Sequence, residues 1–284
     1  MPIGSHLFRK VTIVGVGLIG GSLGLAIKKN QVAREVVGYS QRHATLDAAI
    51  KSGAIDQGYQ DLKKAVQNAD LVILATPVSI ISGMMTMLGP NLRRGCIVTD
   101  VGSIKKSIID AAEQHLPSGI FFVGSHPMAG SEKRGVENAS AELFVNATCL
   151  VTPTKRTHRG ACERIKKFWS RLGTNIKTID PEKHDKILAY TSHLPHLCAY
   201  ALMGVIPVEY LEYSAQGLKD TTRIAGSSAQ LWADICLENS TNILKGLDET
   251  VKTMGVVRRA IIAKDPKSLV STFEEAKNKR DKLV

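Results

Sequence analysis

The chain has 284 residues, of which 44% are hydrophobic, and it carries a formal net charge of +11. Its length suggests about two domains. No apolar run reaches the roughly 18 residues that a membrane-spanning helix requires, and the first residues contain no hydrophobic signal region. We therefore expect a cytoplasmic protein that has no membrane partner.

The positive charge and the cysteines restrict the class of protein further. A basic surface attracts either nucleic acid or small anions, such as acidic substrates and phosphate-rich cofactors. Aromatic residues make up only 5% of the chain, and it has no basic tail or RNA-binding aromatic signature, which argues against a nucleic-acid partner. The five cysteines are scattered and no two have C-x-x-C spacing, so we expect free thiols and no metal site.

The first part of the chain alternates short apolar runs with amphipathic stretches, which is typical of βαβ units. This pattern predicts an α/β Rossmann-type domain over residues 1–180, with a parallel-rich, doubly wound sheet. Strands are predicted at 10–15, 35–39, 71–75, 96–99, 120–123, 147–151 and 175–179, and helices at 18–29 and 158–172.

The pattern changes after Asp180, where β-branched runs become rare. Asp180 and Pro181 form a helix start, with Asp as the N-cap and Pro at the first helical position. Helical periodicity also covers 230–256 and runs from 266 to the end. We therefore predict a second, all-α domain over residues 181–284.

A glycine-rich turn joins the first predicted strand to the first predicted helix, with Gly15, Gly17 and Gly20 in the spacing G-x-G-x-x-G. The first glycine permits a tight turn, the second lets the backbone approach a pyrophosphate, and the third allows close helix–strand packing. The helix start at Leu18 and Ile19 presents free N–H groups to the phosphates. The turn therefore predicts a dinucleotide-binding site, because a tight turn alone would not require all three glycines.

The end of the second predicted strand bears on the choice of dinucleotide. NAD-binding proteins usually have Asp or Glu there to hold the ribose 2′-hydroxyl. Here the residues are Ser40, Gln41 and Arg42, and no carboxylate is present. Ser40 and Arg42 suit a 2′-phosphate, which favours NADP over NAD. The alternative is that Arg42 is an ordinary surface charge.

Polar residues follow two later strands, at the edge of the sheet where ligands bind in this fold. His126 lies in a predicted loop after strand 120–123 and is followed by Pro127. An imidazole there suits acid–base chemistry, although it could equally bond its own backbone. Ser103, after strand 96–99, could cap the next helix, face the nicotinamide and the reacting hydroxyl, or do both.

Two further groups lie in the helical region. His193 and His196 are three residues apart and therefore lie near one helix face. They are either core histidines or ligands for carboxylates; a metal would need a third ligand, and none has suitable spacing. Arg223 suits a substrate carboxylate, and its alternative partner is Asp220.

Together these segments resemble the prephenate/arogenate dehydrogenase family over most of the chain. The resemblance rests on the order and spacing of VGVGLIGGSLG from Val14, ATP at 75–77, DVGSIK from Asp100, SHPMAG from Ser125, LFVNA from Leu143, SHLPH from Ser192 and DTTRIA from Asp220. It implies a Rossmann domain, a helical domain that forms a homodimer, and an active site between the two.

The resemblance also implies an activity and a set of roles. The activity is oxidative decarboxylation of prephenate to 4-hydroxyphenylpyruvate with hydride transfer to NAD(P), in tyrosine biosynthesis. Arogenate dehydrogenase and a dual-specificity cyclohexadienyl dehydrogenase are the alternatives. His126 and Ser103 match the catalytic residues near the ring hydroxyl. Substrate and cofactor contacts are implied for His193, His196, Arg223, Thr76 and Pro77.

Two other functions compete with this one. A 3-hydroxyacid dehydrogenase has a similar architecture, but it usually relies on a catalytic Lys in its helical domain, whereas the candidate base here is His126. A cofactor-sensing protein would keep the nucleotide fold without turnover and would not need His126 or Arg223.

Overall fold

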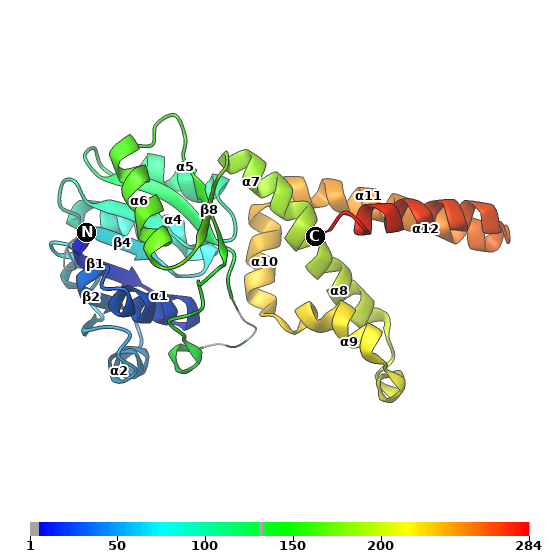
Figure 1. Cartoon of the computed structure of the whole chain (residues 1–284), viewed down its shortest axis with the longest axis horizontal. Coiled ribbons are helices and arrows are strands. Elements are labelled where there is room, and N and C mark those ends of the chain that lie inside the picture. Colours follow the sequence, from blue (N-terminus) through cyan, green and yellow to red (C-terminus); the bar gives the residue numbers. More distant parts are fainter. Residues whose placement is uncertain (1–5, 131–132, 134, 284) are drawn as a thin grey trace.

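The computed structural model of the chain describes residues 6–130, 133 and 135–283. Its first part is built on an eight-stranded sheet with the order β3-β2-β1-β4-β5-β6-β7-β8 (Figure 1). All neighbouring strands are parallel except β6 and β7. The strands are β1 (Phe8–Val14), β2 (Ala33–Tyr39), β3 (Gln57–Tyr59), β4 (Leu71–Leu74), β5 (Ile97–Asp100), β6 (Phe121–Pro127), β7 (Thr148–Thr152) and β8 (Asn175–Thr178).

Because β1 to β6 run parallel, their carboxyl ends share one edge of the sheet. The strand order reverses between β1 and β4, and such a reversal is where doubly wound sheets bind their ligands. The predicted α/β architecture is therefore confirmed, and the sheet directs the glycine-rich turn after β1 and the residues after β4 and β5 to a common edge.

Helices cover both faces of the sheet and bury two apolar clusters. One cluster contains Leu23 and Phe168 on the face of α1, α2 and α6, and the other contains Met85 and Ile108 on the face of α3, α4 and α5. The second cluster also takes in Trp232 from the helical region, so the two parts of the chain share apolar packing. These helices are α1 (Leu18–Lys29), α2 (His43–Lys51), α3 (Leu62–Val66), α4 (Val78–Leu88), α5 (Lys106–His115) and α6 (Arg159–Arg171).

The chain after residue 180 is helical. Asp180 caps the first of these helices by accepting hydrogen bonds from the N–H groups of Glu182 and Lys183, both at 3.0 Å, as predicted. The helices are α7 (Pro181–Leu188), a π-helical turn (Ala189–His193), α8 (Leu194–Val205), α9 (Gln216–Thr222), α10 (Ala229–Glu238), α11 (Ser240–Ile262) and α12 (Pro266–Arg280).

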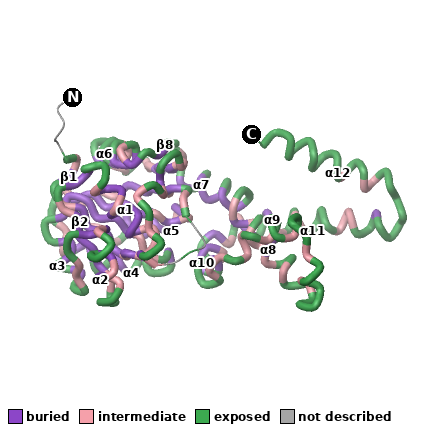
Figure 2. Tube along the Cα trace, turned by 60° about the horizontal axis from the view of Figure 1, so that its bottom comes forward, coloured by how far each residue is buried: buried purple, intermediate pink, exposed green. Residues whose placement is uncertain are grey.

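The last two helices form a hairpin that projects from the rest of the molecule (Figure 1), and most of its residues are exposed (Figure 2). In the part of the chain that the structure describes, no helix combines the length and apolar character that crossing a bilayer demands.

The structure differs from the sequence predictions at several positions. The short strand β3 was not predicted. Strand β6 continues through Pro127, so His126 belongs to a strand and not to a loop; the reason is its antiparallel pairing, in which His126 faces Leu150. The helix predicted over 230–256 is interrupted, because α10 ends at Glu238 and α11 begins at Ser240.

Candidate active site

The glycine-rich turn has the geometry that a dinucleotide requires. Gly15 has φ +95°, a left-handed conformation that favours glycine. A Cβ on Gly20 would overlap the carbonyl oxygen of Gly15, whereas the space beside Gly17 is open. Helix α1 begins after Gly17 without a capping side chain and has no acidic residue in its first turn. The first N–H groups of the helix, at Leu18 and Ile19, are therefore available to phosphate oxygens.

The residues after β4 adjoin this turn. A Cβ on Gly15 would lie 2.9 Å from the methyl carbon of Thr76, so the two residues are in contact. The Thr76 hydroxyl is buried and has no hydrogen-bond partner among the described residues. Pro77 immediately precedes α4. The open space at Gly17 and the unpaired hydroxyl of Thr76 both fit a bound dinucleotide.

Ser40 and Arg42 lie just beyond the carboxyl end of β2. The Ser40 hydroxyl accepts the backbone N–H of Arg42 at 3.2 Å, which shapes this loop. The Arg42 side chain is exposed, and it forms no ion pair within the described ranges of the chain. The guanidinium is therefore available to an anion.

His126 is held at the carboxyl end of β6 by a neighbour from the helical region. Its Nδ1 lies 2.9 Å from Nε2 of His184 in α7, and Nδ1 of His184 lies 2.8 Å from Oδ1 of Asp185. The two imidazole rings are nearly perpendicular, with an interplanar angle of 64°. His184 and Asp185 are buried. The Nε2 atom of His126 is the ring nitrogen that this chain of contacts leaves free.

A buried ion pair lies beside His126. Lys105 and Asp100 form a salt bridge, and both side chains are completely buried. Lys105 Nζ also donates to the carbonyl oxygen of Ser125 at 2.9 Å, and Oδ1 of Asp100 accepts the N–H of Ser125 at 3.1 Å. The pair therefore links the end of β5 to Ser125 of β6, the residue that precedes His126.

This environment keeps His126 neutral. Burial lowers the pKa of His126 well below its ordinary value of 6.5, and the nearby His184, Lys105 and His193 lower it further. Burial also lowers the pKa of His184, although Asp185 opposes that shift. At physiological pH the unprotonated imidazole is consequently the main form of His126, as a general base requires.

His193 and His196 both face Trp232 of α10. The His196 ring stacks on the indole with centroids 3.6 Å apart, and the His193 ring meets it edge-on at 5.9 Å. His193 is buried, with Nδ1 3.2 Å from the amide nitrogen of Asn239 and with Nε2 unpaired among the described residues. Burial lowers the pKa of His193 to about 4.

Arg223 starts a 3₁₀ turn (Arg223–Gly226) and is exposed. Its positive charge lowers the pKa of His196, after the larger effect of burial, which places the two near each other. The alternative ion pair with Asp220 is not formed, since Asp220 accepts instead from Gln216 at 2.7 Å. Arg223 has no ion pair with any residue that the structure describes.

Ser103 lies half-buried in the turn between β5 and α5. Of the two roles that the sequence allowed for Ser103, capping of α5 is not observed, because Asp185 takes that place. The Asp185 carboxylate accepts the N–H groups of Lys105 and Lys106, both at 2.8 Å. No contact of Ser103 with His126 is shown, and its nearness to the reacting hydroxyl stays a prediction.

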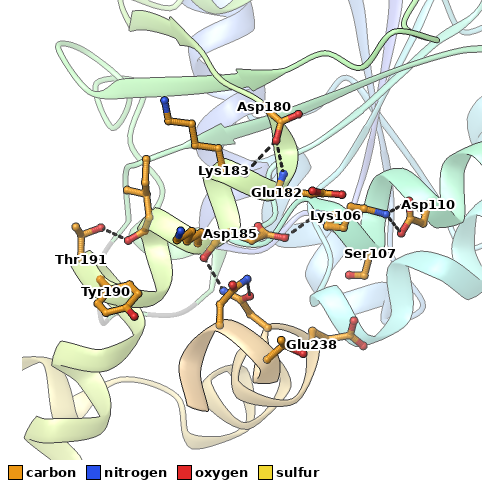
Figure 3. Close-up of a pocket in the computed structure, with 15 residues that line it drawn as sticks. Lys106, Ser107, Asp110, Asp180, Glu182, Lys183, Asp185, Tyr190, Thr191 and Glu238 are labelled. Carbon is orange, nitrogen blue, oxygen red and sulfur yellow. Dashed lines mark hydrogen bonds and ion pairs between the residues drawn. The ribbon is translucent and has the colours of Figure 1, made fainter. Parts of the chain in front are cut away.

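An open cavity of about 1030 Å³ lies on the other side of Asp185. Figure 3 shows Asp185 in its wall, between the helix that carries Lys106 and the segment that carries Glu238. None of the site residues predicted from the sequence lines this cavity. The cavity is therefore distinct from the site predicted from the sequence.

Several residues of this network were not predicted to be functional: Asp100, Lys105, His184, Asp185, Trp232 and Asn239. Asp100 and Lys105 stand in the same DVGSIK segment as Ser103. A signal was present there, because a charged pair at the end of an apolar strand must be buried together or exposed together. His184 and Asp185 carried no comparable signal, since a polar pair in a capped helix is usually solvated.

The chain matches known proteins along nearly its whole length. Residues 23–178 match the model described as the prephenate dehydrogenase nucleotide-binding domain, and residues 180–275 match the prephenate dehydrogenase dimerization domain. The chain is 37% identical to the prephenate dehydrogenase of Bacillus subtilis (strain 168), with 96% of this chain and 76% of that protein covered. It is 35% identical to the cyclohexadienyl dehydrogenase of Zymomonas mobilis, with 96% of each chain covered.

A solved structure agrees. The prephenate dehydrogenase of Aquifex aeolicus, in complex with hydroxyphenyl propionate and NAD+, superposes with a TM-score of 0.89 at 32% identity, covering 97% of this chain and 98% of that one. By contrast, a 3-hydroxyisobutyrate dehydrogenase of Mycobacterium tuberculosis gives 0.52 at 17% identity, which shows a related fold alone. The chain belongs to the prephenate dehydrogenase family.

Proposed function

We propose that this enzyme oxidises and decarboxylates prephenate to 4-hydroxyphenylpyruvate with hydride transfer to NAD(P), in tyrosine biosynthesis. The observation that carries the proposal is the position of His126. A neutral imidazole stands at the carboxyl end of β6, at the same edge of the sheet as the glycine-rich turn, with its Nδ1 engaged by His184. Arogenate, or both compounds, are the alternative substrates.

The helical region supplies the groups for the substrate carboxylates. Arg223 is exposed and without an ionic partner in the described part of the chain, so its guanidinium is free for a bidentate contact with the ring carboxylate. His196 is oriented by its stacking on Trp232 and lies near Arg223. His193 and His196 thus line the substrate pocket in this proposal, with Ser103 near the ring hydroxyl.

His126 serves the reaction as a temporary proton acceptor. Nε2 of His126 takes the proton of the C4 hydroxyl. At the same time the C4–H bond breaks, and the hydrogen leaves with the bonding electron pair as hydride. Bound NAD(P) supplies the hydride acceptor. The bond from C1 to its carboxylate then breaks, the electron pair enters the ring, and CO2 leaves. The phenol oxygen recovers the proton from His126, so none is released overall. The reaction therefore requires mainly that the substrate and the nicotinamide are correctly positioned and that one base has a suitable pKa.

The proposal is tested by following the absorbance of reduced nicotinamide with purified protein, crossing prephenate and arogenate with NAD and NADP. Turnover of prephenate with either nucleotide supports the proposal, and turnover of arogenate alone selects the alternative. Absence of reduction in all four reactions, with folded protein that still binds nucleotide, would contradict it.

We further propose that NADP is preferred over NAD. Ser40 and the unpaired guanidinium of Arg42 stand where NAD-binding relatives usually have a carboxylate. Arg42→Ala should raise the KM for NADP by about 10-fold or more, because a hydrogen-bonded charge pair contributes roughly 1.5–3 kcal/mol. The KM for NAD should change little.

Steady-state kinetics with each nucleotide checks this prediction. Arg34→Ala is the matched control, because Arg34 is an exposed arginine at the end of β2 opposite to Arg42. Equal losses with both nucleotides in Arg42→Ala would remove the assignment of Arg42 to the 2′-phosphate.

We propose that residues 1–180 bind the dinucleotide and that residues 181–284 bind substrate and form a homodimer. The match to a dimerization domain supports this, as do exposed apolar side chains on the projecting hairpin. Met254 on α11 is 64% exposed and Phe273 on α12 is 55% exposed. The free thiols found in the chain fit the reducing cytoplasm, where we place the enzyme.

Met254→Asp should raise the dissociation constant of the dimer by at least about 10-fold, since burying an unpaired charge costs roughly 2 kcal/mol or more. Light scattering after size-exclusion chromatography measures the effect. Asn278→Asp adds the same charge at an exposed polar position of α12 and should leave the dimer intact. An unchanged dimer in Met254→Asp would exclude this part of the hairpin from the interface.

A further inference from the structure

We infer that His184 and Asp185 are positioning residues for His126. Together the three side chains form a hydrogen-bonded relay that fixes His126 as the tautomer with hydrogen on Nδ1 and presents a bare Nε2 to the substrate. The inference rests on the proposed role of His126 as the base, and it adds the two residues that fix the tautomer and orientation of that base.

The relay starts at the Asp185 carboxylate. Its Oδ1 accepts the N–H of Lys105 and Oδ2 accepts the N–H of Lys106, each at 2.8 Å, and Oδ1 also lies 2.8 Å from Nδ1 of His184. Both oxygens thus face donors, which favours the ionised, acceptor-only form. Nδ1 of His184 must therefore carry a hydrogen.

The next step fixes the second ring. A neutral imidazole has one N–H, so when Nδ1 of His184 carries the hydrogen, its Nε2 can only accept. Nε2 of His184 lies 2.9 Å from Nδ1 of His126, which must then be the donor. A neutral His126 with hydrogen on Nδ1 leaves its Nε2 unprotonated. The opposite assignment requires a doubly protonated His184, which complete burial disfavours.

The surroundings hold the relay in one geometry. The first N–H groups of α5 clamp the Asp185 carboxylate, and the Asn239 amide donates to the Asp185 carbonyl oxygen at 2.8 Å. On the other side, Lys105 donates to the carbonyl oxygen of Ser125, the residue before His126. Helices α5, α7 and the α10–α11 junction therefore all fix the orientation of one imidazole in β6.

The relay also accounts for the return of the proton. When His126 Nε2 accepts a proton, the imidazolium is stabilised by the hydrogen bond from its Nδ1 to His184 and by the Asp185 charge behind it. The buried relay holds the proton near the substrate until the phenol oxygen takes it back. Serine-protease triads use a buried carboxylate in a similar way to orient a histidine and stabilise its charged form.

Asp185→Asn separates this role from helix capping. An asparagine can still accept one α5 N–H, but its NH₂ group then faces either Lys106 N–H or His184 Nδ1. The second arrangement reverses the tautomers of both histidines. Asp180→Asn is the matched control, because the Asp180 carboxylate likewise accepts two backbone N–H groups at a helix start but contacts no imidazole among the described residues.

The first readout is the tautomer of His126, measured by ¹⁵N NMR on the full-length protein labelled at histidine nitrogens, with His126→Asn used for assignment. We expect hydrogen on Nδ1 and a bare Nε2 in the wild type. Hydrogen on Nε2 would overturn the relay. This measurement needs neither a substrate nor a stable relay variant, so it tests the relay even if the proposed reaction fails.

The second readout is kinetic. Asp185→Asn and His184→Leu should each lower kcat by about 10- to 100-fold with little change in KM, by analogy with the loss of partners that orient metal-binding histidines. His184→Gln, whose carbonyl oxygen can accept from His126 Nδ1, should recover part of that loss. Wild-type kcat in folded Asp185→Asn or His184→Leu, or an equal loss of kcat in Asp180→Asn, would contradict the proposal.

Discussion

His126→Asn should lower kcat by about 100-fold or more, because a positioned general base contributes roughly that factor. Asparagine is smaller than histidine, and its amide can still donate to His184, but it cannot take up a proton. The substitution therefore removes the chemistry and keeps a hydrogen bond at the end of β6. Nucleotide affinity should be unchanged, since the contacts of His126 are with His184 and the helical region.

Stopped-flow reduction of the nicotinamide under single-turnover conditions measures this effect on the chemical step. His43→Asn is the control, because His43 is an exposed histidine whose only polar side-chain partner among the described residues is Asp47. Near-wild-type turnover by His126→Asn would remove His126 from the mechanism and leave the relay without a function.

The sheet could be predicted from sequence because its signals are local. The buried strand β4 is a continuous apolar run, β1 ends in a buried run in which Thr12 is the one polar residue, and the turn at Gly15 needs only the spacing of its glycines. The start of α7 was predicted in detail, since Asp180 and Pro181 act on their own next turn. Each of these features depends on residues that are close together in the sequence, within a single strand or a single helical turn.

The features that were missed depend on distant residues. The end of β6 is extended by pairing with β7, which no local pattern in residues 121–127 reveals. The interruption between α10 and α11 places Asn239 where its amide reaches the carbonyl oxygen of Asp185, 54 positions away. A tertiary hydrogen bond of this kind overrides continuous helical periodicity.

In the candidate site, too, local features could be predicted and contacts between distant residues could not. His126, His193, His196 and Arg223 were predicted as single residues. The structure places His193 and His196 against Trp232, with Arg223 near His196. The partner that orients His126 was not predicted, because His184 lies 58 positions away on another element. Sequence spacing identifies the residue types that suit the chemistry, whereas their hydrogen-bond partners follow from the packing of α7 against the sheet.

Lys105→Met should lower the free energy of unfolding by about 3–5 kcal/mol, the usual cost of removing one partner from a buried ion pair. Methionine fills most of the same space, so the loss comes from the Asp100 carboxylate. That group would stay completely buried, and its remaining donors among the described residues would be the N–H groups of Gly102 and Ser125. The expected loss is a large share of the roughly 5–15 kcal/mol that stabilises an ordinary domain.

Urea unfolding at fixed protein concentration measures the change, and the chain provides a matched control in the next residue. Lys106 pairs with Asp110 at 2.7 Å, but both side chains are about half exposed, so Lys106→Met should cost less than about 1 kcal/mol. The double variant Asp100→Asn/Lys105→Met should be more stable than Lys105→Met alone, because a neutral amide costs less to bury than an unpaired carboxylate. Equal stability of Lys105→Met and Lys106→Met would show that the buried pair contributes no more than a surface one. The pair would then serve the enzyme mainly by holding Ser125 and the adjoining His126 in place.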